Sequence, residues 1–315
     1  MSSANRQINS HARVIGEILG SNTYRYKVPV YQRNFAWQKD QVNTLWEDLT
    51  GALENNANEY FLGAIVISIG EDDSHREIID GQQRLVAISM ILAAIVRQLR
   101  LINDDKTADS IFRDYLGAED RRTGDIESRL TLNEINDPSF QELVIEQRSF
   151  SKGEVKNWID SNKLLYEAFE ITVNNLNKWL EKFPGMRDAL IDLEEFIQKR
   201  TKLIVIEAGD ESDAFIIFET LNDRGLELAV SDLVKNYLFS LAGTNLETFK
   251  GAWRDMMLLI GEENMPQYLR HFWLSRYGHV QKRELYRAIR EKIKSNIIAR
   301  KFMEDLRKDA NLYSQ

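Results

Sequence analysis

One short segment combines residue types that bind phosphate with a turn that can present them. Residues 78–85 read Ile-Ile-Asp-Gly-Gln-Gln-Arg-Leu, so a β-branched strand runs into Asp80-Gly81 and a long helix begins at once. The first N–H groups of a helix are unpaired and carry partial positive charge, which favours anions. Gly81 permits close backbone approach, and Arg84, in the first turn, can clamp a phosphate bidentately. The segment therefore predicts a phosphate site at the start of this helix.

The other polar side chains of this segment suit a hydrolytic reaction. Gln82 and Gln83 offer neutral donors and acceptors that could position a water or a base edge. Asp80 could bind Mg²⁺ or orient a water. A plainer interpretation explains the spacing at least as well: Asp80 caps the helix and Arg84 is an ordinary surface charge.

A second segment, residues 28–37, follows an expected strand and alternates aromatic side chains with polar donors. Gln32 and Arg33 could reach a phosphate or a base, and the aromatic rings could stack on a ring. The alternative is a strand-to-helix corner whose aromatics close the core, and it is favoured for Phe35 and Trp37. The aromatic residues of the segment are Tyr31, Phe35 and Trp37.

A third segment, residues 215–226, is an expected helix that ends in Asn-Asp-Arg-Gly, with the glycine at a suitable left-handed position. Asn222 and Arg224 could extend into a site beside the Asp-Gly turn. Alternatively, Asn222 is a cap residue and Arg224 is solvated. Polar loop residues carry function more often than helix-face residues do, but the two interpretations stay open.

Together the three segments resemble the N-terminal domain of GmrSD-type modification-dependent restriction enzymes, which also heads SspE-like defence proteins. The family pattern has three boxes: Pro-x-Tyr-Gln-Arg-x-Phe/Tyr-x-Trp, Ile-Asp-Gly-Gln-Gln-Arg-Leu and Phe-x-x-x-Asn-x-Arg-Gly-x-x-Leu. They stand here in the family's order, and the resemblance covers roughly residues 10–240. The boxes are Pro29 to Trp37, Ile79 to Leu85 and Phe218 to Leu228.

The resemblance implies an α+β fold with a ParB/sulfiredoxin-like mixed sheet core and a large helical remainder. In such folds a Gly-x-x-Arg helix start cradles nucleotide phosphates, and residues 81–84 fit that slot. Family members are nucleoside triphosphate hydrolases coupled to the sensing of modified DNA, so the implied activity is GTPase-like phosphoanhydride hydrolysis with Mg²⁺ as cofactor. The implied catalytic residues are Asp80, which also holds the metal, Gln82, Gln83 and Arg84. The implied nucleotide-binding residues are Tyr31, Gln32, Arg33, Gly81, Asn222 and Arg224.

The chain departs from the family in one respect, because full-length members usually carry a C-terminal HNH-type nuclease domain. Its four histidines show no nuclease signature, and only His271 and His279 lie near each other in sequence. We therefore expect these two to be packing or surface residues and expect no DNA cleavage by this chain. An HNH-type nuclease domain or subunit is an implied partner. The sequence leaves open a truncated or split system and homodimer formation.

The amino-acid composition excludes several classes of protein. The chain has 315 residues, 43% of them hydrophobic, enough for a substantial core, and its 29% charged content argues against a disordered chain. The absence of cysteine excludes thiol chemistry, including sulfiredoxin-type redox chemistry on this fold. We find no signal sequence and no apolar stretch long enough to span a bilayer, so a cytoplasmic protein without membrane contact is expected.

Charge is distributed unevenly. The net charge is −8, yet residues 1–37 carry +4 and residues 281–315 carry +5, which leaves −17 for the middle. The basic C-terminal stretch is a candidate DNA-binding strip, although a solvated helix face is the simpler interpretation. A non-catalytic DNA-binding or partner-docking module is therefore the alternative function. The strip's candidate residues are Arg283, Arg287, Arg290 and Lys294.

Hydrophobic periodicity predicts the strands and helices that carry these residues. We expect a nucleotide-binding sensor domain over residues 1–240 and a helical C-terminal region over 241–315. The spacing predicts strands at about 24–30, 61–69, 77–80 and 202–207. It predicts helices at 8–19, 42–53, 82–101, 158–183, 186–199, 213–221 and 231–241. Residues 103–138 are polar and broken, with one short helix and one short strand at best.

Overall fold

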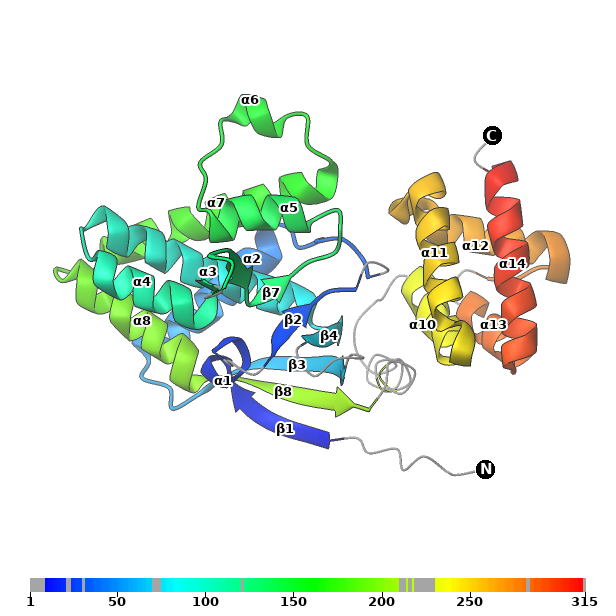
Figure 1. The fold of residues 1–315 in the computed structure, drawn as a ribbon, viewed down its shortest axis with the longest axis horizontal. Helices are drawn as coiled ribbons and strands as arrows, with labels where there is room; N and C mark the ends of the chain where they lie inside the picture. Colours follow the sequence, from blue (N-terminus) through cyan, green and yellow to red (C-terminus); the bar gives the residue numbers. More distant parts are fainter. Residues whose placement is uncertain are drawn as a thin grey trace. The chain divides into compact units, whose positions relative to one another are not determined.

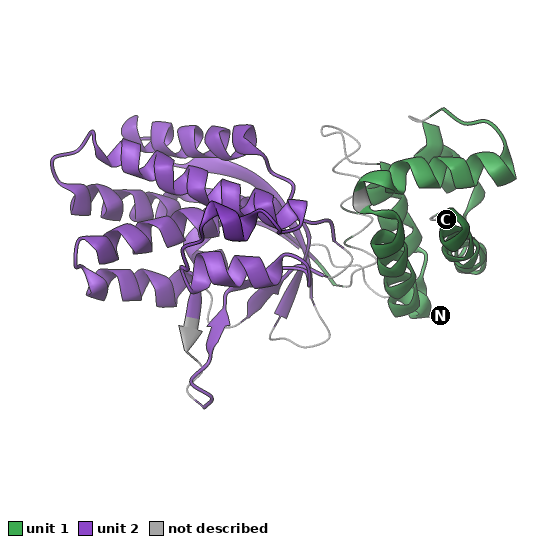
Figure 2. Cartoon of the chain, turned by 90° about the horizontal axis from the view of Figure 1, so that it is seen from above, with its two compact units in different colours: residues 1–7, 208–315 green, residues 8–207 purple. Residues whose placement is uncertain are grey.

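A computed structural model describes residues 9–20, 24–29, 32–69, 75–119, 122–209, 214, 217, 230–281 and 284–313. The chain divides into two compact units, which Figure 2 shows in purple for residues 8–207 and in green for the remainder. Each unit has its own buried core. Among the described residues, no helix combines the length and the apolar character needed to cross a membrane.

The first unit contains a six-stranded mixed sheet with the order β1-β8-β3-β4-β2-β7. The β1/β8 and β3/β4 pairs are antiparallel, whereas β2 pairs with both β4 and β7 in parallel. A separate antiparallel pair is formed by β5 and β6. The strands are β1 (Asn9–Val14), β2 (Arg25–Lys27), β3 (Tyr60–Ile69), β4 (His75–Asp80), β5 (Gly117–Glu119), β6 (Ile126–Ser128), β7 (Leu130–Thr131) and β8 (Thr201–Ala208).

Helices gather around α3 beside this sheet (Figure 1). The helix α3 packs against α4, α7 and α8, and α7 also packs against α2. The helices of the unit are α1 (Ile15–Leu19), α2 (Lys39–Glu54), α3 (Gln82–Leu101), α4 (Asp105–Tyr115), α5 (Asp137–Phe140), α6 (Lys152–Val155), α7 (Asp160–Leu180) and α8 (Met186–Arg200). A single π-helical turn, η1 (Gln141–Ile145), follows α5.

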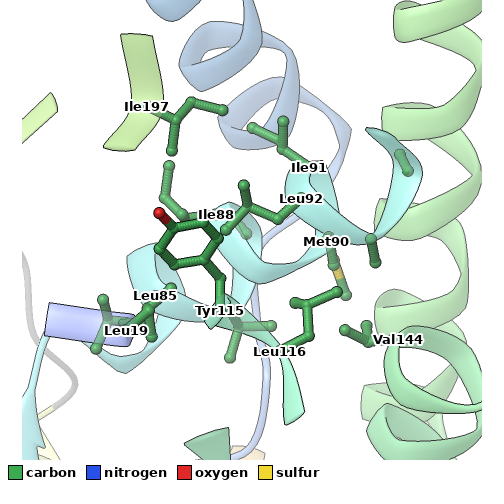
Figure 3. Packing of buried hydrophobic residues seen from close by; sticks show 14 of the residues in the cluster. Leu19, Leu85, Ile88, Met90, Ile91, Leu92, Tyr115, Leu116, Val144 and Ile197 are labelled. Atoms are coloured by element: carbon green, nitrogen blue, oxygen red, sulfur yellow. The ribbon is translucent and has the colours of Figure 1, made fainter. Parts of the chain in front are cut away.

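The core of the first unit is built on α3, which is apolar on nearly every side, as its sequence predicts. Figure 3 shows Ile88, Met90 and Leu92 of this helix packed among side chains from α1, α4, η1 and α8. The helix is therefore held on several sides, which fixes the position of its N-terminal turn.

Two sequence predictions about the first unit are wrong. The apolar spacing predicts one helix over residues 8–19, but Asn9–Val14 form a strand and only Ile15–Leu19 are helical. The reason is long-range pairing, since Asn9 to Val14 face Glu207 to Lys202 of β8 in antiparallel register. The segment 103–138 also holds more structure than expected: the helix α4 and the strands β5, β6 and β7.

The strand at β2 is confirmed, but it is shorter than expected and lies inside the sheet, between β4 and β7. It ends before Pro29, which has no backbone N–H to donate to a neighbouring strand. Val28 still donates its N–H to the carbonyl of Thr131 at 2.8 Å. The chain then leaves the sheet and turns toward the start of α2.

The second unit is helical over its described part from Val230 onward, as the amphipathic patterns predict. Its core includes Phe239, Trp253, Phe272 and Phe302. The elements are α10 (Val230–Ser240), η2 (Gly243–Asn245), α11 (Leu246–Ile260), η3 (Glu262–Asn264), α12 (Met265–Tyr277), α13 (Leu285–Lys292) and α14 (Asn296–Tyr313). The expected helix at 213–221 lies largely outside the described residues. A mixed α/β chain with one mixed sheet and a large helical part is thus confirmed.

Candidate functional site

The turn from β4 into α3 depends on Gly81. This glycine is the N-cap of α3 and has φ 92° and ψ 4°, a left-handed conformation that L side chains rarely adopt. A Cβ at this position would lie 2.4 Å from Cγ2 of Ile65 and 3.0 Å from the carbonyl oxygen of Ala64. Glycine thus allows the strand to change into a helix within one residue. Asp80 is the last residue of β4 and is half-buried, and the cap position belongs to Gly81.

Gln82 and Gln83 are both buried and bind the segment that precedes α2. The Gln82 Nε2 donates to the carbonyl of Arg33 at 2.9 Å. The Gln83 Oε1 accepts from the N–H groups of Ala36 at 3.0 Å and Trp37 at 3.3 Å, and its Nε2 donates to the carbonyl of Asn34 at 3.3 Å. The structure thus brings the first and second boxes together, with the two glutamine amides as the link.

Three further buried amides complete this network, and two of them were not expected from the sequence. Gln32 donates from Nε2 to the carbonyl of Ile79 at 3.0 Å, next to the β4 terminus. Asn133 donates to the carbonyl of Gln32 at 3.2 Å, and Asn136 accepts from the N–H of Phe35 at 2.7 Å. Buried backbone groups outside regular structure need such partners. The Asn133-Glu134-Ile135-Asn136 spacing carries no motif that distinguishes it from an ordinary turn.

Arg33 and Phe35, both in the segment that precedes α2, lie in different environments. Phe35 is buried in the core, as the plainer interpretation of the aromatics predicts. Arg33 is half-buried and lines a small, partly open hollow of about 10 Å³ together with Gln82, Gln83 and Asn133. That volume is about the minimum that a single water occupies, so the network is close-packed.

Arg84 lies on the other side of the helix start, over β3. Its Nη1 donates to the carbonyl of Ala64 at 3.2 Å. Gly63, at φ 119°, makes room for it, because a Cβ there would lie 3.2 Å from the Arg84 Nε. The arginine also lines an open pocket of about 360 Å³ between α2, β3 and α3, together with the half-buried Trp37 and Tyr60.

One pKa in this pocket is displaced. Burial raises the pKa of Tyr60 to about 12, and the charge and the hydrogen bond of Asp48 act in the same direction, while Arg84 opposes them. The phenol therefore stays protonated at neutral pH. It donates to the Asp48 Oδ2 at 3.3 Å.

The structure does not place every predicted site residue. Tyr31, Asn222, Arg224 and Arg283 lie outside the described residues. Arg287, Arg290 and Lys294 belong to the second unit and are exposed. His271 is exposed on α12, where its Nδ1 lies 3.1 Å from the Tyr313 hydroxyl.

The described residues include no group of three or more His, Asp or Glu side chains placed to hold a metal ion. Asp80, the predicted Mg²⁺ ligand, would thus act as a single protein carboxylate. This donor set fits Mg²⁺, which in nucleotide sites takes one or two carboxylates and fills its shell with phosphate and water oxygens.

The fold and the geometry define a mixed α/β domain in which a glycine-initiated helix, an arginine in its first turn and a buried amide network meet at the end of one strand. Residues 15–239 match the family model of the GmrSD restriction endonuclease N-terminal domain, and the chain belongs to that family. No curated protein matches the chain.

Proposed function

We propose that this chain is the nucleoside-triphosphate-hydrolysing sensor domain of a modification-dependent restriction system, built on a ParB/sulfiredoxin-like core. The observation that carries the proposal is the start of α3. There Gly81 permits the left-handed N-cap that starts the helix, so the first N–H groups of α3 follow β4 directly, and Arg84 contributes a guanidinium within the same turn. The chain belongs to a family of restriction endonucleases, which are enzymes that cut DNA, and this supports the proposed role in DNA restriction.

Several polar residues of the three boxes have distinct roles in this proposal. In the proposal Asp80 and Arg84 face the phosphates, and Arg33 approaches the helix start from the opposite side, where it lies beside Gln82 and Gln83. Gln82 and Gln83 keep the segment before α2 in place, since their amides bind its backbone. Tyr31, Asn222 and Arg224, predicted from the family boxes, would complete the nucleotide site.

The reaction is the attack of water on the terminal phosphorus, with cleavage of the phosphoanhydride bond and departure of the nucleoside diphosphate. Such a reaction needs positioning and charge neutralisation more than a protein nucleophile. A bound Mg²⁺ would neutralise phosphate charge. The protein's part is to fix the phosphates on the α3 N-terminus and to hold an Arg84 guanidinium against them.

The test is phosphate release by the purified chain with a panel of nucleoside triphosphates and Mg²⁺, with and without modified DNA. We expect turnover that rises with the cognate DNA, and we expect Arg84→Ala to reduce it by about 100-fold, because a charge contact on the transferred phosphoryl group is lost. Arg97→Ala is the matched control: it removes the same charge 13 residues later on α3, about 20 Å away. Equal activity of the wild type and Arg84→Ala would remove the proposed phosphate site.

The alternative, a DNA-binding or partner-docking module, is favoured by exposed cations on and after α13. Arg287 and Arg290 are helical neighbours at i and i+3, and Lys294 follows the helix. Arg287 is also paired with Glu291 at 3.0 Å, which lowers the charge available for phosphate. DNA affinity through these residues must fall steeply between 50 and 200 mM salt. Flat salt dependence would exclude this surface. An HNH-type nuclease domain or subunit is the proposed partner.

A further inference from the structure

The pocket beside Arg84 includes apolar and aromatic side chains in its lining. It measures about 360 Å³, within the roughly 300–1,000 Å³ range of small-molecule sites. Leu45 of α2 and Leu62 of β3 form buried parts of its lining, and the half-buried Trp37 and Tyr60 form others. A flat ring that can stack on an aromatic side chain suits such a space better than a flexible chain.

The charges around this pocket disfavour phosphate inside it. Two exposed carboxylates, Asp40 and Asp48, line the pocket against a single guanidinium, Arg84. The local balance is therefore negative, and a polyphosphate in the pocket would be repelled. A neutral group that presents N–H donors would instead be accepted by the carboxylates.

Asp48 is held in position for such a contact. The Tyr60 hydroxyl donates to its Oδ2 at 3.3 Å, and Tyr60 comes from β3, whereas Asp48 comes from α2. A carboxylate has about four acceptor sites on two oxygens, so this hydrogen bond leaves capacity for a ligand. Arg84 forms the border between the pocket and the N-terminus of α3.

We propose that this pocket binds the base of the nucleotide, with the ring against Trp37 and an exocyclic amino group donating to Asp48. The phosphates then extend past Arg84 toward the α3 N-terminus. This inference rests on the proposed nucleotide hydrolysis and adds the class of nucleotide: one whose base carries an amino group, in preference to uracil or hypoxanthine. Carboxylate side chains accept from base amino groups in the same way when they contact nucleic acids.

The test compares dissociation constants of ATP, GTP, CTP, UTP, ITP and inorganic tripolyphosphate for the full chain. We expect the tightest ligand to carry an amino group. Asp48→Asn should reduce its preference over UTP and ITP by about tenfold, because a hydrogen bond to a charged carboxylate is replaced by a weaker one to a neutral amide oxygen. Tripolyphosphate should bind Asp48→Asn as it binds the wild type. Trp37→Leu should weaken every nucleotide by about tenfold through lost stacking.

Glu47→Gln is the matched control, since it removes the adjacent exposed charge on α2 without removing a pocket side chain. It should leave the base preference unchanged. Tightest binding of UTP or ITP, or a base preference that Asp48→Asn leaves intact, would overturn the pocket assignment while nucleotide binding stands. Failure of every nucleotide and of tripolyphosphate to bind would instead overturn the proposed function itself.

Discussion

Replacing Gly81 by alanine is expected to destabilise the first unit strongly. The left-handed conformation at φ 92° costs an L residue about 1–2 kcal/mol. The new Cβ would also meet Ile65 Cγ2 at 2.4 Å and the Ala64 carbonyl oxygen at 3.0 Å, so β3 or the helix start must shift. Overpacking of this kind costs about 1–3 kcal/mol. We therefore expect Gly81→Ala to lower the free energy of unfolding by about 2–5 kcal/mol.

Urea denaturation followed by circular dichroism measures this loss. With a slope of about 3 kcal/mol per molar urea, the unfolding midpoint should fall by about 1 M. Gly51→Ala in α2 is the matched control, because no atom lies within 4 Å of the place that its new methyl group would take and its backbone is helical. That change should raise stability by about 0.5–1 kcal/mol. A loss below about 1 kcal/mol for Gly81→Ala would show that the turn relaxes freely and would refute the requirement for glycine.

Two further changes test the buried polar groups. Glu194 of α8 is buried, and burial, followed by the charge of Glu195, raises its pKa to about 7 from an ordinary 4.5. As pH rises from about 4.5 to 7, this carboxyl ionises in the unfolded chain while it keeps its proton in the folded one. The free energy of unfolding therefore falls over this range, by about 3 kcal/mol at most. We expect the free energy of unfolding of Glu194→Gln, relative to that of the wild type, to be higher at pH 8 than at pH 5. The exposed Asp192→Asn should show no such change. A difference between Glu194→Gln and the wild type that does not depend on pH would contradict this. Gln83→Ala removes three hydrogen bonds to residues 34–37 and should cost about 2–4 kcal/mol. Hydrogen exchange should then speed up at the Ala36 and Trp37 amides, and unchanged protection there would show that the glutamine does not hold the segment.

Local periodicity was enough to predict several helices and strands of the first unit. The helix α3 reproduces its predicted range, 82–101, because a largely apolar 20-residue stretch begins after Asp-Gly and needs no distant partner to be identified. The strands β3 and β8 follow from short β-branched runs in the same way. The three boxes also placed the chain in its family, which the match over residues 15–239 confirms.

Other features depend on contacts between residues far apart in the chain and follow only from the folded structure. The apolar side chains over residues 8–19 have a helical spacing, but pairing with β8, almost 200 residues away, makes residues 9–14 a strand. The amides of Asn133 and Asn136 acquire a role only because folding brings them to the backbone of Gln32 and Phe35, about 100 residues earlier. The pocket beside Arg84 likewise joins Trp37, Asp48 and Tyr60, whose spacing resembles no motif. Periodicity in the sequence predicts which face of a helix or strand is apolar. Hydrogen-bond partners and pockets depend instead on which helices and strands pack together in the folded chain.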